Sequence, residues 1–397
     1  MSNQGLNWPP DEDLFAAARS LPSRSKVAKH FGIKPNTMNA RCLRDPTFAA
    51  ELDSCLTSET LEAPPLEEIH EARIKELEQE LRKRQKASVL TERVAIAVTE
   101  AIERRGVPKF TPRPRKRKTP KDGTHEFVLL WSDLHYGEVV SEEETNGINE
   151  YDPAICWERH EKLRHALFSY ADNRPYNIEK LHVLALGDML SGSIHPELKE
   201  TNQFPLAEAT IDLGERGAEW LESLSEVFPK IEVAGVVGNH PRFDMKSRNK
   251  GGFDNADWMS YHHMRSLLRD HEAFSFDIPR ANSHIHSVYG RNILMFHGDS
   301  IRSSMPGVPW GGVMRRATTL HAQYAQQGLP LDLYVCGHFH QRALVNGPGG
   351  SRIAMNGSTK GVDEYGLKNF GGGEGPGQML LTYNHEHGLT DCSLLDL

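Results

Sequence analysis

Five short motifs rich in histidine and acidic residues are spaced through the last two thirds of this 397-residue chain, and each follows a short apolar run. The motifs are Asp133-Leu134-His135, Gly187-Asp188, Gly238-Asn239-His240, His297-Gly298 and Gly337-His338-Phe339-His340. The apolar runs before them are Phe127–Leu130, Leu181–Leu186, Val233–Val237, Ile293–Phe296 and Leu333–Cys336. Runs of this kind are typical of buried strands. Because residues just beyond the carboxyl ends of strands meet at one sheet edge, the pattern predicts an α/β domain with one polar site.

The side chains in these motifs have the chemistry of metal ligands. Seven of them offer carboxylate, amide and imidazole donors without a thiolate: Asp133, His135, Asp188, Asn239, His297, His338 and His340. That donor set suits Mn²⁺, Fe²⁺ or Zn²⁺ rather than Ca²⁺. Seven ligands are too many for one tetrahedral zinc but suit two ions roughly 3.5–4 Å apart. We therefore expect two divalent cations, with Mn²⁺ first and Fe²⁺ or Zn²⁺ as alternatives, in a site that hydrolyses phosphate esters.

The order of the motifs, D-x-H, G-D, G-N-H, H and G-H-x-H, resembles that of the calcineurin-like metallophosphoesterase superfamily, over residues 126 to 358. The resemblance implies a four-layer α/β/β/α sandwich, which we assign to residues 125–397. The segments around Arg352–Met355 and Gln378–Thr382 would be late strands that close its second sheet. It implies that Asp133, His135 and His340 hold one metal, that Asn239, His297 and His338 hold the other, and that Asp188 bridges them. A metal-bridging hydroxide would then attack phosphorus, while the catalytic His240 stabilises charge or protonates the leaving oxygen.

Two departures from the family pattern concern the residues around the metals. Many members carry an acidic residue after G-N-H, but here Pro241 and Arg242 follow, so a partner that orients His240 must come from elsewhere. The branch of double-strand-break-repair exonucleases places a histidine three residues after the G-D aspartate, where this chain has Ser191. The chain also resembles metallophosphoesterases of phages and prophages described as DNA exonuclease-like, by arrangement rather than by matched residues.

The first 60 residues predict a separate small all-α domain. Short helices are expected at Glu12–Arg19, Ser25–Phe31 and Asn36–Leu43, and the last two resemble a helix-turn-helix. The second of these would present Asn36, Thr37, Asn39 and Arg41 to DNA. The alternative is a three-helix adaptor that binds protein.

The segments between the two domains are rich in charge. Residues 61–105 predict a helical or short coiled-coil segment, and residues 66–105 could join two chains as a homodimer. Residues 106–124 form a basic linker with four prolines, which could also tether nucleic acid. Residues 1–122 hold 23 Lys and Arg against 18 Asp and Glu, a net +5, whereas the whole chain is −8, which leaves −13 for residues 123–397.

A second basic stretch follows the G-N-H motif. Its residues Arg242, Lys246 and Arg248 are predicted to bind the phosphodiester substrate.

The five cysteines are scattered and never in C-x-x-C spacing, and no apolar run is long enough for a membrane span, so we expect a cytoplasmic protein without a membrane partner.

These features together favour a dinuclear-metal phosphodiesterase that hydrolyses nucleic acid, with DNA as substrate and a front domain that delivers it. The first alternative is hydrolysis of a small phosphodiester, such as a cyclic nucleotide or a dinucleotide, by the same site. The second is a catalytically inactive DNA-binding scaffold. The intact ligand set argues against the scaffold, because buried carboxylates and imidazoles without metal would leave charge unpaired.

Overall fold

The computed structural model describes residues 8–21, 23–56, 124–194, 198–244, 252–301, 307–370 and 372–397. The chain divides into two compact units, residues 1–91 and 92–397, and each is described by itself. The predicted helical and dimerisation segment at 61–105 lies outside the described residues, as does the predicted linker at 106–124 apart from Thr124. In the described ranges, every helix is too short or too polar to cross a membrane.

The first unit is a small bundle of short helices: α1 (Asp11–Ala18), α2 (Arg24–His30), α3 (Pro35–Arg44) and α4 (Pro46–Cys55). Leu14, Val27, Met38 and Leu52 are fully buried between them. The three predicted helices are confirmed, but α4 was missed. A single residue separates α3 from α4: Asp45 ends α3, and its carboxylate accepts a hydrogen bond from the Phe48 amide to cap α4.

The second unit contains two sheets. The six-stranded sheet has the order β11-β10-β1-β2-β3-β4. Strands β1 to β4 are parallel to one another, β10 pairs antiparallel with β1, and β11 pairs antiparallel with β10. Its strands are β1 (Thr124–Trp131), β2 (Asn177–Ala185), β3 (Ile231–Gly235), β4 (Phe274–Asp277), β10 (Gly377–Asn384) and β11 (Gly388–Asp396). The five-stranded sheet has the order β5-β6-β7-β9-β8, with β6, β7 and β9 parallel. Its strands are β5 (Ser283–Val288), β6 (Arg291–Phe296), β7 (Leu333–Cys336), β8 (Ala343–Asn346) and β9 (Arg352–Met355).

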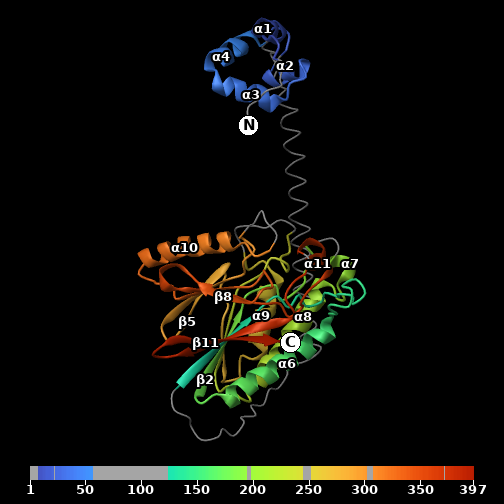
Figure 1. The fold of residues 1–397 in the computed structure, drawn as a ribbon. Coiled ribbons are helices and arrows are strands. Elements are labelled where there is room, and N and C mark those ends of the chain that lie inside the picture. Colours follow the sequence, from blue (N-terminus) through green and yellow to red (C-terminus); the bar gives the residue numbers. More distant parts are fainter. Residues whose placement is uncertain are drawn as a thin grey trace, which may run out of the picture. The chain divides into compact units, whose positions relative to one another are not determined.

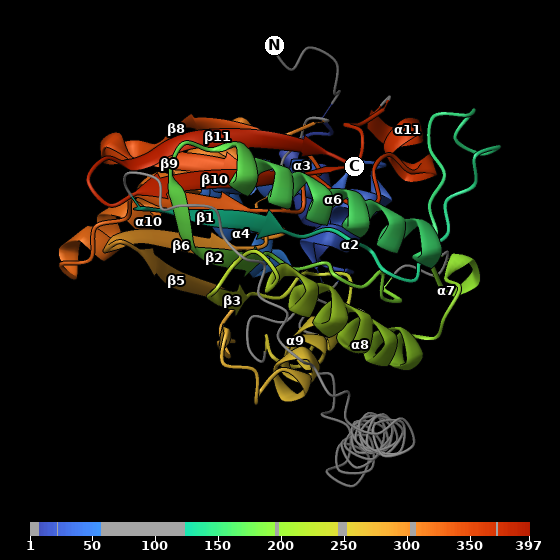
Figure 2. The same cartoon turned by 90° about the horizontal axis from the view of Figure 1, so that it is seen from below.

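Helices cover the outer faces of both sheets (Figures 1 and 2). The helices α6 (Pro153–Asn173), α8 (Leu206–Leu224) and α9 (Ala256–Leu267) pack on the six-stranded sheet, and α10 (Trp310–Gln326) packs on the other. A third apolar cluster fills the space between the sheets. The other helices in the described ranges are short: α7 (Leu198–Thr201), α11 (Glu364–Phe370) and the 3-10 helix at Pro348–Gly350. The predicted α/β/β/α sandwich is confirmed.

One late strand was assigned to the wrong sheet. The segments Arg352–Met355 and Gln378–Thr382 were both predicted to close the second sheet, and the first does so as β9. The second lies within β10, which pairs antiparallel with β1, so that Leu381 lies opposite Val128 in the six-stranded sheet. Apart from the exposed Arg352 at the start of β9, both segments are buried, so the sequence pattern contains nothing that distinguishes one sheet from the other.

His160, on α6, forms a buried polar contact behind β1. The Trp131 indole N–H donates to His160 Nε2 at 2.9 Å, and His160 Nδ1 lies 2.8 Å from the Cys156 carbonyl oxygen, which its N–H donates to. Both nitrogens of the neutral ring are therefore used. Burial lowers the pKa of His160 to about 4.

This histidine should make the protein less stable in acid. The unfolded chain binds a proton at His160 below about pH 6.5, but the folded chain does so only below about pH 4, so its contribution is complete above pH 6.5 and declines as the pH falls. We expect the free energy of unfolding, measured with urea, to fall by about 2 kcal/mol between pH 7 and pH 5 through this group. His160→Gln, which keeps one acceptor and one donor, should reduce that fall. The same change at the exposed His165 should not; equal slopes in both variants would contradict the assignment.

Candidate metal centre

The predicted ligands stand at the carboxyl ends of five parallel strands, three in one sheet and two in the other. Asp133 and His135 follow β1, Asp188 follows β2, and Asn239 follows β3. From the second sheet, His297 follows β6, and His338 and His340 follow β7. Backbone hydrogen bonds join the first two loops, since the amides of Asp133 and His135 donate to the carbonyls of Gly187 and Asp188, each at 3.0 Å.

The backbone of these loops has an unusual conformation. In the described ranges, seven non-glycine residues have positive φ, and five of them are predicted ligands: Asp133, His135, Asp188, His338 and His340, with φ between 49° and 69°. Aspartate and histidine tolerate this left-handed region better than most residues, but it is sparsely populated. Such strained positions cluster at functional sites, where the surrounding structure holds them. The coincidence of strain with the predicted ligands supports a common function for them.

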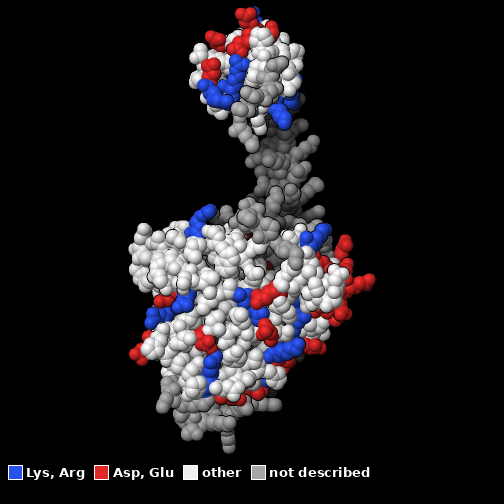
Figure 3. Space-filling model, in the orientation of Figure 1, with Lys and Arg blue, Asp and Glu red and all other residues white. Residues whose placement is uncertain are grey.

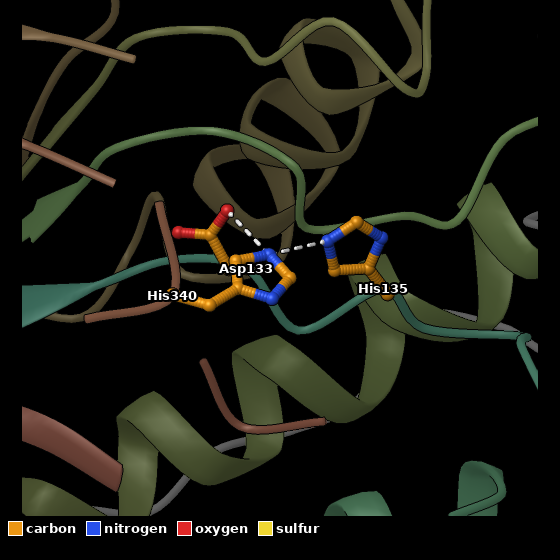
Figure 4. Close-up of side chains that lie close together, drawn as sticks. All are labelled: Asp133, His135 and His340. Carbon is orange, nitrogen blue, oxygen red and sulfur yellow. Dashed lines mark hydrogen bonds and ion pairs between the residues drawn. The ribbon is translucent and has the colours of Figure 1, made fainter. Parts of the chain in front are cut away.

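The first ligand group consists of Asp133, His135 and His340, whose side chains converge from two loops (Figure 4). His340 Nε2 lies 3.1 Å from His135 Nε2 and 3.4 Å from Asp133 Oδ1. Asp133 also accepts hydrogen bonds from the His338 amide and, at 2.6 Å, from the hydroxyl of Ser132. These bonds fix the carboxylate toward the two imidazoles.

The second ligand group consists of Asp188, His297 and His338, with Asn239 beside it. His297 Nε2 lies 2.9 Å from Asp188 Oδ2 and 3.2 Å from Asn239 Oδ1. The other ring nitrogen, Nδ1, donates to the Leu186 carbonyl at 2.8 Å, which turns Nε2 into the site. Asp188 also belongs to a third group, with His135 and His240. It thus lies between the two metal groups, where a bridging carboxylate would be.

The burial and charge of these side chains fit divalent cations. Asp133 and Asp188 are essentially fully buried, and their ion pairs in the described part of the chain are with His340 and His297. Although burial alone would lower the pKa of His297, the adjacent Asp188 carboxylate raises it to about 10. Although burial alone would raise the pKa of Asp188, His297 and His240 hold it well below its ordinary value. A divalent cation that binds to these side chains would displace the proton that His297 and Asp188 share.

His240 is oriented by a backbone carbonyl rather than by an acidic residue. Its Nδ1 lies 3.0 Å from the carbonyl oxygen of Ser191, and its backbone amide donates to Asp188 Oδ1 at 2.8 Å. Its ring stands edge-on to the ring of His135, with centroids 4.6 Å apart. The Nδ1–H bond fixes the tautomer, so Nε2 is the nitrogen that can meet a substrate. The partner that the sequence left open is therefore Ser191.

His240→Asn should lower the turnover of a phosphodiester by about 10²–10⁴-fold without loss of metal, because the role expected for this imidazole is to meet the reacting phosphate without being a ligand. Turnover on bis-p-nitrophenyl phosphate and metal content by atomic emission would measure the two effects separately. Loss of metal along with activity would show that His240 is a ligand after all.

Three buried residues behind Asp133, namely Ser132, Asn356 and Gln378, support the site, and Ser132 and Gln378 were missed by the sequence analysis. Asn356 donates to the Ser132 hydroxyl at 3.0 Å and to Gln378 Oε1 at 2.6 Å, and Gln378 donates to the Ser132 carbonyl. Ser132 in turn donates to Asp133. These partners come from the loop after β9 and from β10, more than 200 residues away in the sequence, so no local pattern indicates them.

A buried ion-pair cluster lies behind His135. Glu138 Oε2 is 3.6 Å from His135 Nδ1, and Glu138 Oε1 is 3.0 Å from the ammonium of Lys360, which also pairs with Asp363. Although burial alone would lower the pKa of Lys360, the two carboxylates raise it above its ordinary value. At 3.6 Å the contact between Glu138 and His135 is an ion-pair distance rather than a hydrogen bond, so the carboxylate acts on this ring through its charge.

The predicted substrate-binding residues follow the G-N-H motif, and the predicted DNA-binding residues belong to the first unit. Arg242 donates to the carbonyls of Asp244 and Asn239, which stabilises its own loop, and Lys246 and Arg248 lie outside the described residues. In the first unit, Asn36 and Asn39 are exposed on α3 and Thr37 is half-buried. The Arg41 guanidinium pairs with Asp11 and lies 4.7 Å from the ring centroid of Trp8 and 4.0 Å from that of Phe48.

Comparison with known proteins finds similar structures only. No protein-family model matches the sequence, and no curated protein matches it. An archaeal phosphodiesterase is 11% identical, with 68% of this chain and 99% of that chain covered and a TM-score of 0.30. Vps29 with Zn²⁺ from Entamoeba histolytica is 16% identical, with 68% and 98% covered and a TM-score of 0.28. A Streptococcus pneumoniae protein described as a predicted phosphoesterase is 10% identical, with 68% and 97% covered and a TM-score of 0.27. Because these values are low, we base the function on the ligand geometry.

Proposed function

We propose that this protein is a metal-dependent phosphodiesterase. The observation that carries the proposal is the convergence of seven oxygen and nitrogen donors, from the ends of five strands, on one buried site with Asp188 at its centre. Mixed carboxylate, amide and imidazole donors suit Mn²⁺, Fe²⁺ and Zn²⁺. A pair of such ions would activate a water molecule and neutralise the charge on phosphate oxygens.

The residues of the chain contribute position and proton transfer. Asp133, His135 and His340 would hold one ion, Asn239, His297 and His338 the other, and Asp188 both. Because the ligands stand at the ends of packed strands and their carboxylates are hydrogen-bonded to backbone amides, the site is organised before substrate binds. His240, whose Nδ1–H is held by the Ser191 carbonyl, would take up a second proton on Nε2 and donate that proton to the leaving oxygen.

Hydrolysis of bis-p-nitrophenyl phosphate after dialysis against a chelator tests this function. We expect no turnover without added metal and restored turnover with Mn²⁺, since the ligands supply no nucleophile of their own. Parallel titrations with Fe²⁺ and Zn²⁺ would rank the ions. Turnover that survives chelation, with metal shown to be absent, would contradict the proposal.

DNA is the substrate that we propose, with the first unit as the module that delivers it. The support is the net positive charge of residues 1–122 and the exposed polar side chains of Asn36 and Asn39 on α3. On the face of residues 124–397 drawn in Figure 3, positive and negative side chains are interspersed rather than gathered into a basic surface. A separate DNA-binding domain that brings DNA to the site would supply such a surface. A small phosphodiester is the runner-up substrate.

A gel shift with linear DNA tests the delivery role. Because Arg41 packs against Trp8 and Phe48, its removal would disturb folding, so the informative variant is Asn36→Ala with Asn39→Ala. We expect this double variant to bind DNA more weakly, while Glu51→Ala, an exposed change on α4, binds as the wild type does. Equal affinity in all three proteins, together with hydrolysis of the small diester alone, would favour the runner-up.

A further inference from the structure

A second group of histidine and glutamate side chains lies at the other end of the strands from the catalytic motifs. His182 on β2, Glu232 on β3 and His286 on β5 each place a donor atom within 4.8 Å of the others. His182 Nδ1 is 2.7 Å from His286 Nε2 and 3.6 Å from Glu232 Oε2. His182 precedes Asp188 by six residues, so in extended chain this group is on the order of 20 Å from the catalytic site.

These side chains occupy positions where the pattern of the core calls for apolar residues. Along β2, His182 shares a face with Leu184, which packs between the sheets. His286 shares a face with Val288 in the same way on β5, which belongs to the other sheet. His182 and His286 are almost completely buried. Two polar rings replacing core residues at an inter-sheet contact need a compensating partner.

The hydrogen bonds prepare the ring of His182 to bind a cation. Glu126 on β1 lies 2.9 Å from His182 Nε2 and accepts its N–H, which leaves a lone pair on Nδ1, the nitrogen that faces His286 and Glu232. A carboxylate that fixes the tautomer of a histidine in this way is typical of metal sites.

The charge and spacing also suit a cation. Glu126 and Glu232 carry two negative charges, and Lys180, 3.1 Å from Glu232, carries one positive charge. His182 Nδ1 lies 2.7 Å from one donor atom and 3.6 Å from the other, and all three lie within 4.8 Å of one another, while two distances in the first-described metal centre are 2.9 and 3.4 Å. Two ligands of a tetrahedral zinc are separated by roughly 3.3 Å. The side chain of Glu232 is 29% exposed, which gives a route from solvent.

We propose that His182, Glu232 and His286 form a separate metal site that binds one zinc-like divalent cation and ties the two sheets together. Two imidazoles and one carboxylate would occupy three positions of a tetrahedron, with water in the fourth. The site differs from the catalytic one in having no bridging carboxylate and no second group of ligands beside it among the described residues. Its role would be to stabilise the sandwich rather than to hydrolyse phosphate.

Zinc content of the full-length protein tests the site. Metal-free protein would be loaded with Zn²⁺, freed of excess by gel filtration and analysed by atomic emission. We expect Glu232→Gln and His286→Gln each to hold one zinc per chain fewer than the wild type. His284→Gln, two residues from His286 on β5 but paired with Asp277, should hold as much as the wild type. Zinc content equal to that of the wild type in Glu232→Gln and His286→Gln would overturn the proposal.

Two additions keep the test decisive. Glu232 is partly exposed, so Glu232→Gln should fold even if His286→Gln does not, and its zinc affinity should fall at least tenfold. In an Asp188→Asn background, Co²⁺ should still give the visible absorption of a four-coordinate ion, and adding Glu232→Gln should remove it. Unchanged absorption after adding Glu232→Gln would overturn the proposal. If the catalytic site bound no metal, the comparison of the two proteins would still be valid.

Discussion

Replacing Asp188 by asparagine is expected to lower the turnover of bis-p-nitrophenyl phosphate by on the order of 10³-fold and to weaken the binding of both metal ions. The carboxylate lies between the two ligand groups, 2.9 Å from His297 Nε2 and in the group that contains His135. An amide offers one neutral oxygen and therefore neither bridges two cations nor offsets their charge. The effect should exceed the roughly 10–100-fold expected for losing a hydrogen-bond partner of a ligand.

The fold should survive the Asp188→Asn change. The side-chain oxygen of the introduced amide can still accept the hydrogen bond that the His240 backbone amide donates to Asp188 Oδ1 in the native protein. The metal-free variant should therefore unfold at nearly the urea concentration of the metal-free wild type.

The matched control is Asp270→Asn, the same chemical change at an aspartate whose side chain is 86% exposed and pairs with Arg269. It should keep wild-type turnover and metal content. A variant of Asp188 that retains two metals and at least a tenth of the activity would contradict the bridging role.

The sequence was sufficient to predict the strands before the motifs, and the convergence of the motif side chains, because both depend on local pattern. Each ligand motif directly follows an apolar run, and the parallel order of β1, β2 and β3 brings the ends of those runs together. Chain order, however, does not determine strand pairing. This is why Gln378–Thr382 was placed in the wrong sheet: β10 is buried along almost its whole length and would suit either one.

What the sequence did not predict depends on contacts between distant segments. The group that orients His240 is the carbonyl of Ser191, and a backbone atom leaves no signal in the residue types. The inter-sheet histidines, His182 and His286, are 104 residues apart, and neither stands in a recognisable motif. The helix α4 was missed for a related reason within a short segment, because a single residue, Asp45, both ends α3 and caps α4.

Gly238→Ala is expected to lower turnover by about 10²-fold or more and to destabilise the fold by about 1–3 kcal/mol. A Cβ atom at this position would lie 2.0 Å from Asp188 Oδ1 and 2.1 Å from the Asp188 amide nitrogen, so the loops after β2 and β3 would have to separate. Asp188 is the group that both ligand sets share, and a displacement of about 1 Å is enough to impair catalysis severely. Urea unfolding, metal content and turnover of bis-p-nitrophenyl phosphate would measure the effects.

Gly311→Ala is the matched control for that substitution, and its expected effect on stability has the opposite sign. Gly311 is exposed in the first turn of α10, and a Cβ there would have no heavy atom within 4 Å. Since alanine favours a helix over glycine by up to about 1 kcal/mol, the free energy of unfolding should stay the same or rise, and turnover should not change. If both alanine variants kept wild-type turnover and stability, the close approach of the Gly238 loop to Asp188 would not be needed for the site, and the proposed bridging geometry would be wrong.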